Sequence, residues 1–278
     1  MTRIVAVANQ KGGVGKTTTT INLAASLALA ERRVLLVDVD PQGNLTSGVG
    51  QKNKAAEAGT TYDALTSAEP TTDARPFIIP TAVDRLSLIP ADRNLTGAEI
   101  EMVTLATREE RLRALLQSVR ESFDYIFIDC PPSLGLLTLN MLTAADSVII
   151  PIQCEYYALE GLSQLLNTVK LVQRNFNPAL AIEGVLLTMY DARLNLCKQV
   201  AEEAKEYFGG RMFNVTIPRN VRLAEAPSFG KPIVLYDVQS IGAKSYLAVA
   251  QELIRRVEQG APPSPSLPAI EPLPEVPA

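Results

Sequence analysis

The sequence contains no histidine and only three cysteines among its 278 residues. Without histidine, the chain has neither a histidine-based catalytic triad nor a histidine-ligated zinc site. Cys130, Cys154 and Cys197 are too scattered for the closely spaced pairs that zinc and iron–sulfur sites use. We therefore expect three reduced thiols in or near the core, and a chemistry that depends on other side chains.

Long apolar runs are also missing, although 47% of the residues are hydrophobic. No run approaches the roughly 20 residues that a membrane-spanning helix needs, and the first residues lack the pattern of a secretory signal. The net charge of −4 gives no general attraction to nucleic acid, so any such binding must come from a local patch. We expect a cytoplasmic protein with one α/β domain and a tail.

A glycine-rich segment lies between a short apolar run and a helical pattern. Residues 11–18 read KGGVGKTT. Glycines at a strand-to-helix turn bring backbone N–H groups close to phosphate oxygens, and the helix N-terminus adds positive charge there. Lys16 supplies a full charge for the β- and γ-phosphates, and Thr17 the hydroxyl for Mg²⁺. Gln10 occupies the place of the first glycine in the general phosphate-loop pattern, so this loop is a variant of it.

Two other apolar runs predict strands that end in aspartate. The first ends at Asp38 and is followed by Asp40, which points the same way if the strand continues, because side chains alternate with period two. Carboxylates at the carboxyl end of a parallel sheet lie where open α/β folds bind ligands. The second run ends at Asp129, the place of the carboxylate that holds the Mg²⁺ shell in phosphate-loop enzymes. With Thr17, Asp129 predicts a magnesium–nucleotide site.

Strand and helix patterns alternate along most of the chain. Further strands are predicted at 86–90, 147–152, 183–189 and 215–218, and helices at 61–65, 98–105, 109–119, 158–172, 195–207 and 240–257. The alternation predicts an α/β fold with an open, mostly parallel sheet and helices on both faces. Residues 260–278 are rich in proline and lack hydrophobic periodicity. We therefore expect one ATPase-type domain over 1–259 and a disordered tail over 260–278.

These segments resemble the ParA-type partition ATPases of the ParA/MinD class, which have a deviant Walker phosphate loop. Among them, the chain is most similar to the short chromosomal Soj-like proteins. The resemblance extends from residue 1 to about 258. It rests on residues 11–18, 38–44 (DVDPQGN), 128–132 (IDCPP), 189–193 (MYDAR) and 217–228 (IPRNVRLAEAPS).

The resemblance implies an ATPase that binds ATP and Mg²⁺ and dimerises around the nucleotide. Lys11 would reach the nucleotide of the second subunit, and Gly12 would let the two backbones approach closely. Lys11, Lys16 and Asp40 are then the catalytic residues, with Asp40 orienting the attacking water. Asp129 belongs to the Mg²⁺ shell with Thr17, and Asp38 lies nearby. The implied nucleotide-binding residues are Lys11, Gly12, Gly13, Val14, Gly15, Lys16, Thr17, Thr18, Pro218 and Asn220.

The resemblance also implies partners. They are a second copy of the chain, double-stranded DNA bound without sequence preference, and a ParB-type protein that triggers hydrolysis on the nucleoid. Arg193 and Arg222 occupy positions where Soj-like proteins contact DNA. Lys198, Arg219 and Lys231 are weaker candidates for the same surface.

Three other functions stay open. The chain could position a protein cargo over the nucleoid, regulate the division site as MinD-like proteins do, or bind nucleotide as a scaffold without turnover. A MinD-like regulator needs a basic amphipathic helix on the membrane, whereas no lysine or arginine follows Arg256, so we expect no membrane partner. Lys11, Asp40 and Asp129 argue weakly against a scaffold. The sequence favours a DNA-partition ATPase, with protein-cargo transport as the alternative.

Overall fold

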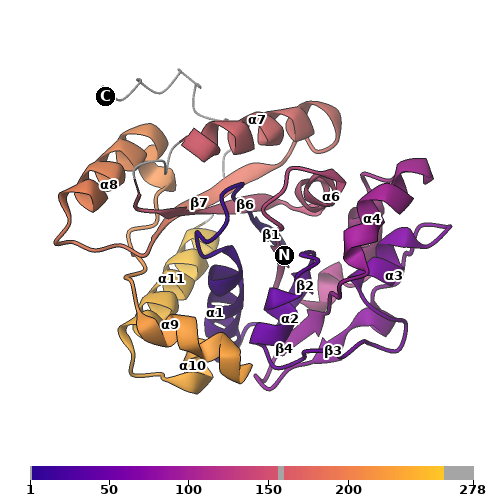
Figure 1. Cartoon of the computed structure of the whole chain (residues 1–278), viewed down its shortest axis with the longest axis horizontal. Helices are drawn as coiled ribbons and strands as arrows, with labels where there is room; N and C mark the ends of the chain where they lie inside the picture. The colour runs from indigo at the N-terminus through magenta and orange to yellow at the C-terminus, as the bar shows by residue number, and fades with distance from the viewer. Residues whose placement is uncertain (1, 156–159, 260–278) are drawn as a thin grey trace.

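The computed structural model describes residues 2–155 and 160–259, which build a seven-stranded sheet between two layers of helices (Figure 1). The strand order is β3-β4-β2-β5-β1-β6-β7. β3 pairs with β4 in the antiparallel sense, and all other pairs are parallel. The strands are β1 (Arg3–Val7), β2 (Val34–Asp38), β3 (Ile79–Pro80), β4 (Leu86–Ile89), β5 (Tyr125–Asp129), β6 (Ser147–Gln153) and β7 (Ala181–Thr188).

Helices cover both faces of the sheet and pack against two separate hydrophobic cores. One face carries α3 (Thr61–Thr66), α4 (Leu95–Glu101), α5 (Arg111–Gln117), α6 (Leu136–Ala144), α7 (Glu160–Asn175) and α8 (Asn195–Phe208). The other carries α1 (Lys16–Leu29), α2 (Asn44–Gly48), α9 (Val221–Glu225), α10 (Ile233–Tyr236) and α11 (Ile241–Glu258). The predicted α/β fold, with an open and mostly parallel sheet, is confirmed.

Three of the parallel strands are buried along their whole length. Every residue of β2, β5 and β7 is buried, as expected for parallel strands that are covered on both faces. Alternate side chains enter opposite cores: Ile4 and Ala6 of β1 face α3–α8, whereas Val5 and Val7 face α1 and α11. Burial on both sides fixes the register, because a slip of one residue would exchange the two faces.

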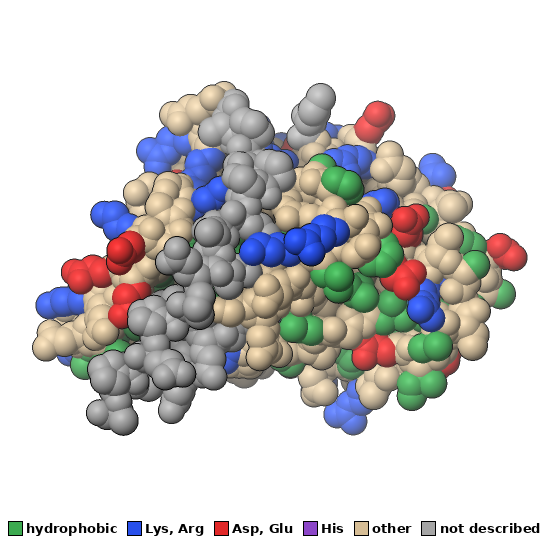
Figure 2. Space-filling view, turned by 90° about the horizontal axis from the view of Figure 1, so that it is seen from above, with side chains coloured by type: hydrophobic (Ala, Val, Ile, Leu, Met, Phe, Trp, Pro, Cys, Tyr) green, Lys and Arg blue, Asp and Glu red, His purple; other side chains and the backbone are tan. Residues whose placement is uncertain are grey.

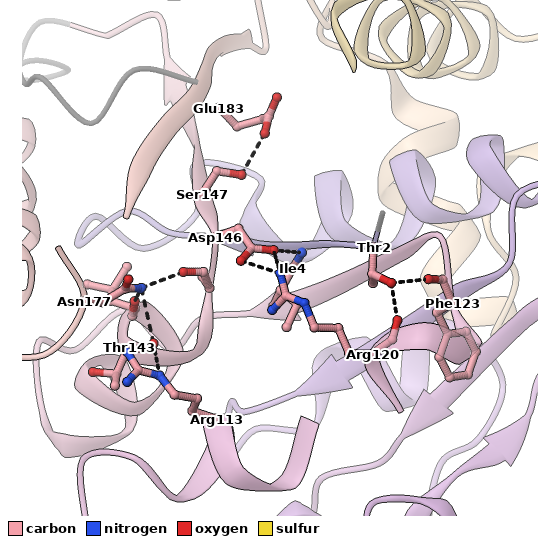
Figure 3. Close-up of polar contacts among 12 residues, drawn as sticks. Thr2, Ile4, Arg113, Arg120, Phe123, Thr143, Asp146, Ser147, Asn177 and Glu183 are labelled. Carbon is pink, nitrogen blue, oxygen red and sulfur yellow. Dashed lines mark hydrogen bonds and ion pairs between the residues drawn. The ribbon is translucent and has the colours of Figure 1, made fainter. Parts of the chain in front are cut away.

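Polar side chains close the sheet at the amino ends of its strands (Figure 3). The Asp146 carboxylate accepts the Ile4 N–H at 2.9 Å and two hydrogen bonds from Arg120 at 2.7 Å. Glu183 accepts the Ser147 hydroxyl at 2.7 Å. Asn177 donates to three backbone carbonyls at the end of α6. These hydrogen bonds pair the polar groups at the amino edge of the sheet. The candidate site lies at the opposite, carboxyl edge.

The prediction of a strand at 215–218 is wrong. This segment runs beside β7 and donates from Phe213 and Ile217 to its carbonyls, at 2.9 and 2.8 Å. It makes only isolated bridges, whose registers differ by one residue. The register slips between Phe213 and Ile217, so no continuous ladder forms. The Asn214 N–H, which points away from β7, donates to the Glu252 carboxylate of α11 at 3.0 Å.

Other elements were absent from the prediction or fall outside the described residues. β3, α6, α9 and α10 were not predicted. The predicted helix over 158–172 begins in the described part of the chain at Glu160, and residues 158–159 lie outside it. The predicted tail over 260–278 also lies outside, so the domain boundary stays a prediction. Within the described residues, no helix is long and apolar enough to cross a bilayer.

Replacing Glu252 with alanine should destabilise the domain. The carboxylate is buried and accepts the Asn214 backbone and side-chain amides and the Arg256 guanidinium at 2.6 Å. Removing one partner of a buried ion pair leaves the other uncompensated and costs about 3 kcal/mol. Urea unfolding measures this cost. The matched control is Glu258→Ala, which breaks the exposed Arg32–Glu258 pair and should cost about 0.5 kcal/mol or less. Equal costs would contradict the anchoring role of Glu252.

Candidate functional site

The glycine-rich loop joins β1 to α1 at the carboxyl edge of the sheet. Gly15 precedes the first residue of α1 with φ 87°, a left-handed conformation that glycine adopts without strain. The Thr188 hydroxyl at the end of β7 donates to the Val14 carbonyl at 2.9 Å and so fixes the loop from the side. Gly12 and Gly13 are exposed, and Thr18 is half-buried. The loop thus stands over the helix N-terminus, in the arrangement that binds phosphate.

Lys16 is the cation at the floor of this loop. Its side chain is buried, and Nζ donates to the Lys11 carbonyl at 3.0 Å. Burial lowers the pKa of Lys16, while Cys130, Asp129 and Asp40 oppose that shift. The nearby carboxylates favour the charged form of Lys16, and a buried ammonium group at a helix N-terminus attracts a phosphate anion.

Asp129 lies at the end of β5, opposite Val7 of β1 in the sheet register. Its carboxylate accepts the Thr17 hydroxyl at 2.7 Å and the Thr20 hydroxyl at 3.0 Å, and it has no exposed surface. Burial, and then the charge of Asp38, raise the pKa of Asp129 to about 8. The structure therefore brings Thr17 and Asp129 together, as the sequence predicts.

Asp38 and Asp40 follow the neighbouring strand but have different surroundings. Asp38 is opposite Asp129 in the register and is fully buried, and burial raises its pKa to about 6. Its Oδ2 accepts the Thr46 N–H at 2.8 Å and hydroxyl at 2.6 Å, so it holds the start of α2. Asp40 lies two residues after Asp38 in the chain, and its Oδ1 accepts the Gln42 N–H at 2.9 Å.

Lys11 extends from the loop and forms an ion pair. Its Nζ lies 2.9 Å from Glu155 Oε2, and both side chains are partly exposed. Sequence reasoning missed Glu155, Thr20 and Thr188. Thr20 lies one helical turn after Lys16, so its place beside Thr17 could have been found. Glu155 and Thr188 follow other strands and carry no local signal.

The two residues implied for the adenine lie beyond the end of β7. Pro218 bridges Tyr190, which follows the strand. Asn220 caps α9, and its Oδ1 accepts the Leu223 N–H at 3.2 Å. Because Thr188 touches the phosphate loop, this segment borders the same edge of the sheet as Lys16.

The two arginines implied for DNA are exposed, and both have carboxylate partners. Arg193 lies 2.6 Å from Asp191, and its side chain is 88% exposed. Arg222 contacts Glu225 at 3.0 Å and Asp237 at 3.5 Å. Lys198, Arg219 and Lys231 are also exposed. Figure 2 shows both basic and acidic side chains on the face that carries α7 and α8.

The donor set fits magnesium bound together with a nucleotide. Among the described residues, no three of histidine, cysteine, aspartate and glutamate gather into a metal cluster. Thr17 and Asp129 offer oxygen atoms only, which Mg²⁺ prefers, and Mg²⁺ commonly takes its remaining ligands from phosphates and water. The site therefore has the donors for a magnesium nucleotide but not for a metal bound by protein alone.

Comparison with known proteins agrees with this geometry. The AAA domain family matches residues 2–182. The chain is 58% identical to the chromosome partitioning protein ParA of Myxococcus xanthus over 254 residues, 91% of this chain and 88% of that protein. It is 59% identical to the sporulation initiation inhibitor protein Soj of Bacillus subtilis over 253 residues, 91% and 98% of the two chains.

A solved structure supports the fold. A cobyrinic acid a,c-diamide synthase from Mycobacterium smegmatis, with bound ADP and magnesium, is 37% identical with a TM-score of 0.81. The match covers 96% of this chain and 100% of that one. The chain has a phosphate loop on a parallel sheet and a buried carboxylate that accepts two threonine hydroxyls. It is also nearly 60% identical to ParA and Soj proteins over nine-tenths of its length. The chain therefore belongs to the ParA/Soj family of chromosome-partitioning P-loop ATPases.

Proposed function

We propose that the chain is an ATP-driven switch that dimerises with ATP, binds double-stranded DNA without sequence preference, and releases it after hydrolysis stimulated by a ParB-type partner. One contact carries the ATPase part of the proposal. It is the hydrogen bond from Thr17 to the buried Asp129, which places the metal-binding hydroxyl and carboxylate below the phosphate loop. The DNA part rests on the relatives' names and on two exposed arginines.

Lys16, Thr17 and Asp129 bind the phosphate end of the nucleotide. The Lys16 ammonium exchanges its contact with the Lys11 carbonyl for the β- and γ-phosphate oxygens. Thr17 and Asp129 would hold magnesium, directly or through water, and the metal would supply positive charge near the phosphates. Because phosphoryl transfer depends mostly on positioning and charge, no protein nucleophile is required.

Asp40 and Lys11 complete the site. The Asp40 carboxylate is nearly buried and stands close enough to Lys16 and Asp129 to affect their pKa values. From there it orients the attacking water. Lys11 leaves Glu155 and reaches the phosphates bound by the second subunit, where a lysine acts as an arginine finger does. A dimer is then needed for full activity.

Replacing Asp129 with asparagine should separate stability from activity. The amide can accept one threonine hydroxyl through its oxygen and donate to the other through its NH2 group, and it carries no charge. The wild-type carboxyl has a folded pKa of about 8, above its ordinary 3.8, so its stability contribution falls as pH rises between these values. Relative to the variant, the nucleotide-free wild type should thus lose unfolding free energy up to pH 8. Magnesium-dependent ATPase should be lost in the variant. If the unfolding free energies of the wild type and the variant changed in parallel with pH, the raised pKa of Asp129 would be contradicted.

Asp40→Ala should bind ATP and dimerise but hydrolyse it roughly 100-fold more slowly, because the water is no longer oriented. The variant should stay on DNA in the presence of ATP. Phosphate release and gel filtration with ATP measure the two properties. A wild-type rate of hydrolysis would show that Asp40 does not position the water.

Arg193→Ala and Arg222→Ala should each weaken binding to every DNA sequence alike, because phosphate contacts carry no base information. The slope of log affinity against log salt should flatten by roughly one unit for each DNA phosphate that the variant no longer neutralises, or about two in a symmetric dimer. Filter binding over a salt series tests this with ATP present.

Arg75→Ala is the matched control for Arg193. Arg75 makes the same local pair with an aspartate two residues earlier, at 2.8 Å, and its side chain is 75% exposed. It should leave DNA binding unchanged. Sequence-selective weakening, or DNA binding that needs no ATP, would contradict the dimer model and favour transport of a protein cargo.

A further inference from the structure

Helix α2 is fixed to the end of the strand that precedes Asp40. The Asp38 carboxylate binds both the N–H and the hydroxyl of Thr46, and the same hydroxyl accepts the Ala91 N–H at 3.0 Å. The loop from Asp40 to Gly43 enters α2 directly. Asp40 belongs to the same network, because its N–H donates to Asp38 Oδ1 at 3.1 Å and its carbonyl accepts the N–H of Gly43, the residue before α2, at 2.9 Å. A movement of the Asp40 backbone is therefore passed to the start of α2.

The far end of α2 meets the segment that follows α9, through two glycine backbones. Gly50 has φ 77° and Gly230 has φ 61°. A Cβ on Gly230 would lie 2.7 Å from Gly50 Cα, and one on Gly50 would lie 2.9 Å from the Gly230 oxygen. Next to this contact lies an open cavity of about 600 Å³, which both segments line, with Lys54, Pro80 and Phe229 in its wall. The glycine contact is thus a direct backbone connection beside an open space.

Side chains continue from Gly230 to Arg222. The Phe229 ring stacks on Tyr236, with centroids 5.0 Å apart. The Tyr236 hydroxyl donates to Glu225 Oε2 at 3.1 Å, and the same oxygen accepts Arg222 at 3.0 Å. The position of Gly230 therefore affects the carboxylate that holds Arg222.

This route can distinguish ATP from ADP, whereas a route through the adenine cannot. Both nucleotides have the same base, so contacts at Pro218 and Asn220 are the same for each. Only the γ-phosphate differs, and the residue proposed to lie beside it is Asp40. A ligand shifts an equilibrium only through contacts that differ between its states.

We propose that the Gly50–Gly230 contact is a relay that positions Arg222 for DNA according to whether a γ-phosphate is present at Asp40. This inference rests on the proposed function and adds a mechanism to it. Gly50 and Gly230 act as positioning residues, since neither belongs to the phosphate site or the DNA surface.

The test measures the ratio of DNA affinity with a non-hydrolysable ATP analogue to that with ADP, using a labelled duplex of random sequence. In Gly230→Ala and Gly50→Ala the ratio should fall by about tenfold, within the usual range of coupling between sites. Affinity for the ATP analogue itself should stay at the wild-type value. Thermal melting shows whether each variant is folded, and Gly50→Ala tests the contact from the other side.

Gly209→Ala is the matched control. Gly209 also has a positive φ, 54°, but a Cβ there meets no atom within 4 Å, so the variant has the backbone strain without the collision. It should keep the wild-type ratio. An unchanged ratio in folded Gly230→Ala, or an equal fall in Gly209→Ala, would overturn the relay alone. A wild-type ratio of one would overturn the proposed function and the relay with it.

Hydrogen exchange on the wild type gives a reading that needs no variant. Replacing ADP with the ATP analogue should change exchange at residues 44–51 and 226–231 together. A change at the first segment without the second would overturn the relay.

Discussion

The buried carboxylate of Asp129 determines how the other parts of the site are arranged. It has no contact with solvent, and two hydroxyls from the first turn of α1 satisfy it. A buried carboxylate charge is energetically costly unless a cation binds next to it. Burial therefore holds this group near its neutral form, with its pKa near 8. In the proposed function, a magnesium nucleotide bound beside this carboxyl group would favour its ionised form, and nucleotide binding would be coupled to release of its proton.

The exposed arginines are already engaged before any DNA is present. Arg193 and Arg222 each have a carboxylate within 3.0 Å. Contact with a DNA phosphate is therefore an exchange of one anion for another, and the gain from a single arginine is smaller than that of a free cation. In the proposed function, tight binding would require several such exchanges at once, which the two copies in a dimer would supply. A chain with a net charge of −4 would bind DNA in this way.

The sequence predicted elements whose pattern depends on local chemistry. The phosphate loop, the aspartates at strand ends and the amphipathic α8 were all recognisable, because turn residues and side-chain period lie within one segment. Helix α6 was missed because most of its residues are buried and it lacks a polar face. The 215–218 segment was misassigned because its register against β7 slips, so that it makes isolated bridges instead of a ladder. Glu155 beside Lys11 was likewise invisible, since two strands meet only in the folded sheet.

Both lateral edges of the sheet are closed to further strands. At one edge, β3 has two residues, and its exposed Pro80 has no N–H to offer. At the other, the segment from Phe213 to Ile217 already uses carbonyls of β7. Such edges protect against the strand-to-strand association that leads to aggregates. If copies of this chain assemble on DNA as proposed, they would therefore meet through side chains and helices, without the strand pairing that makes assembly irreversible.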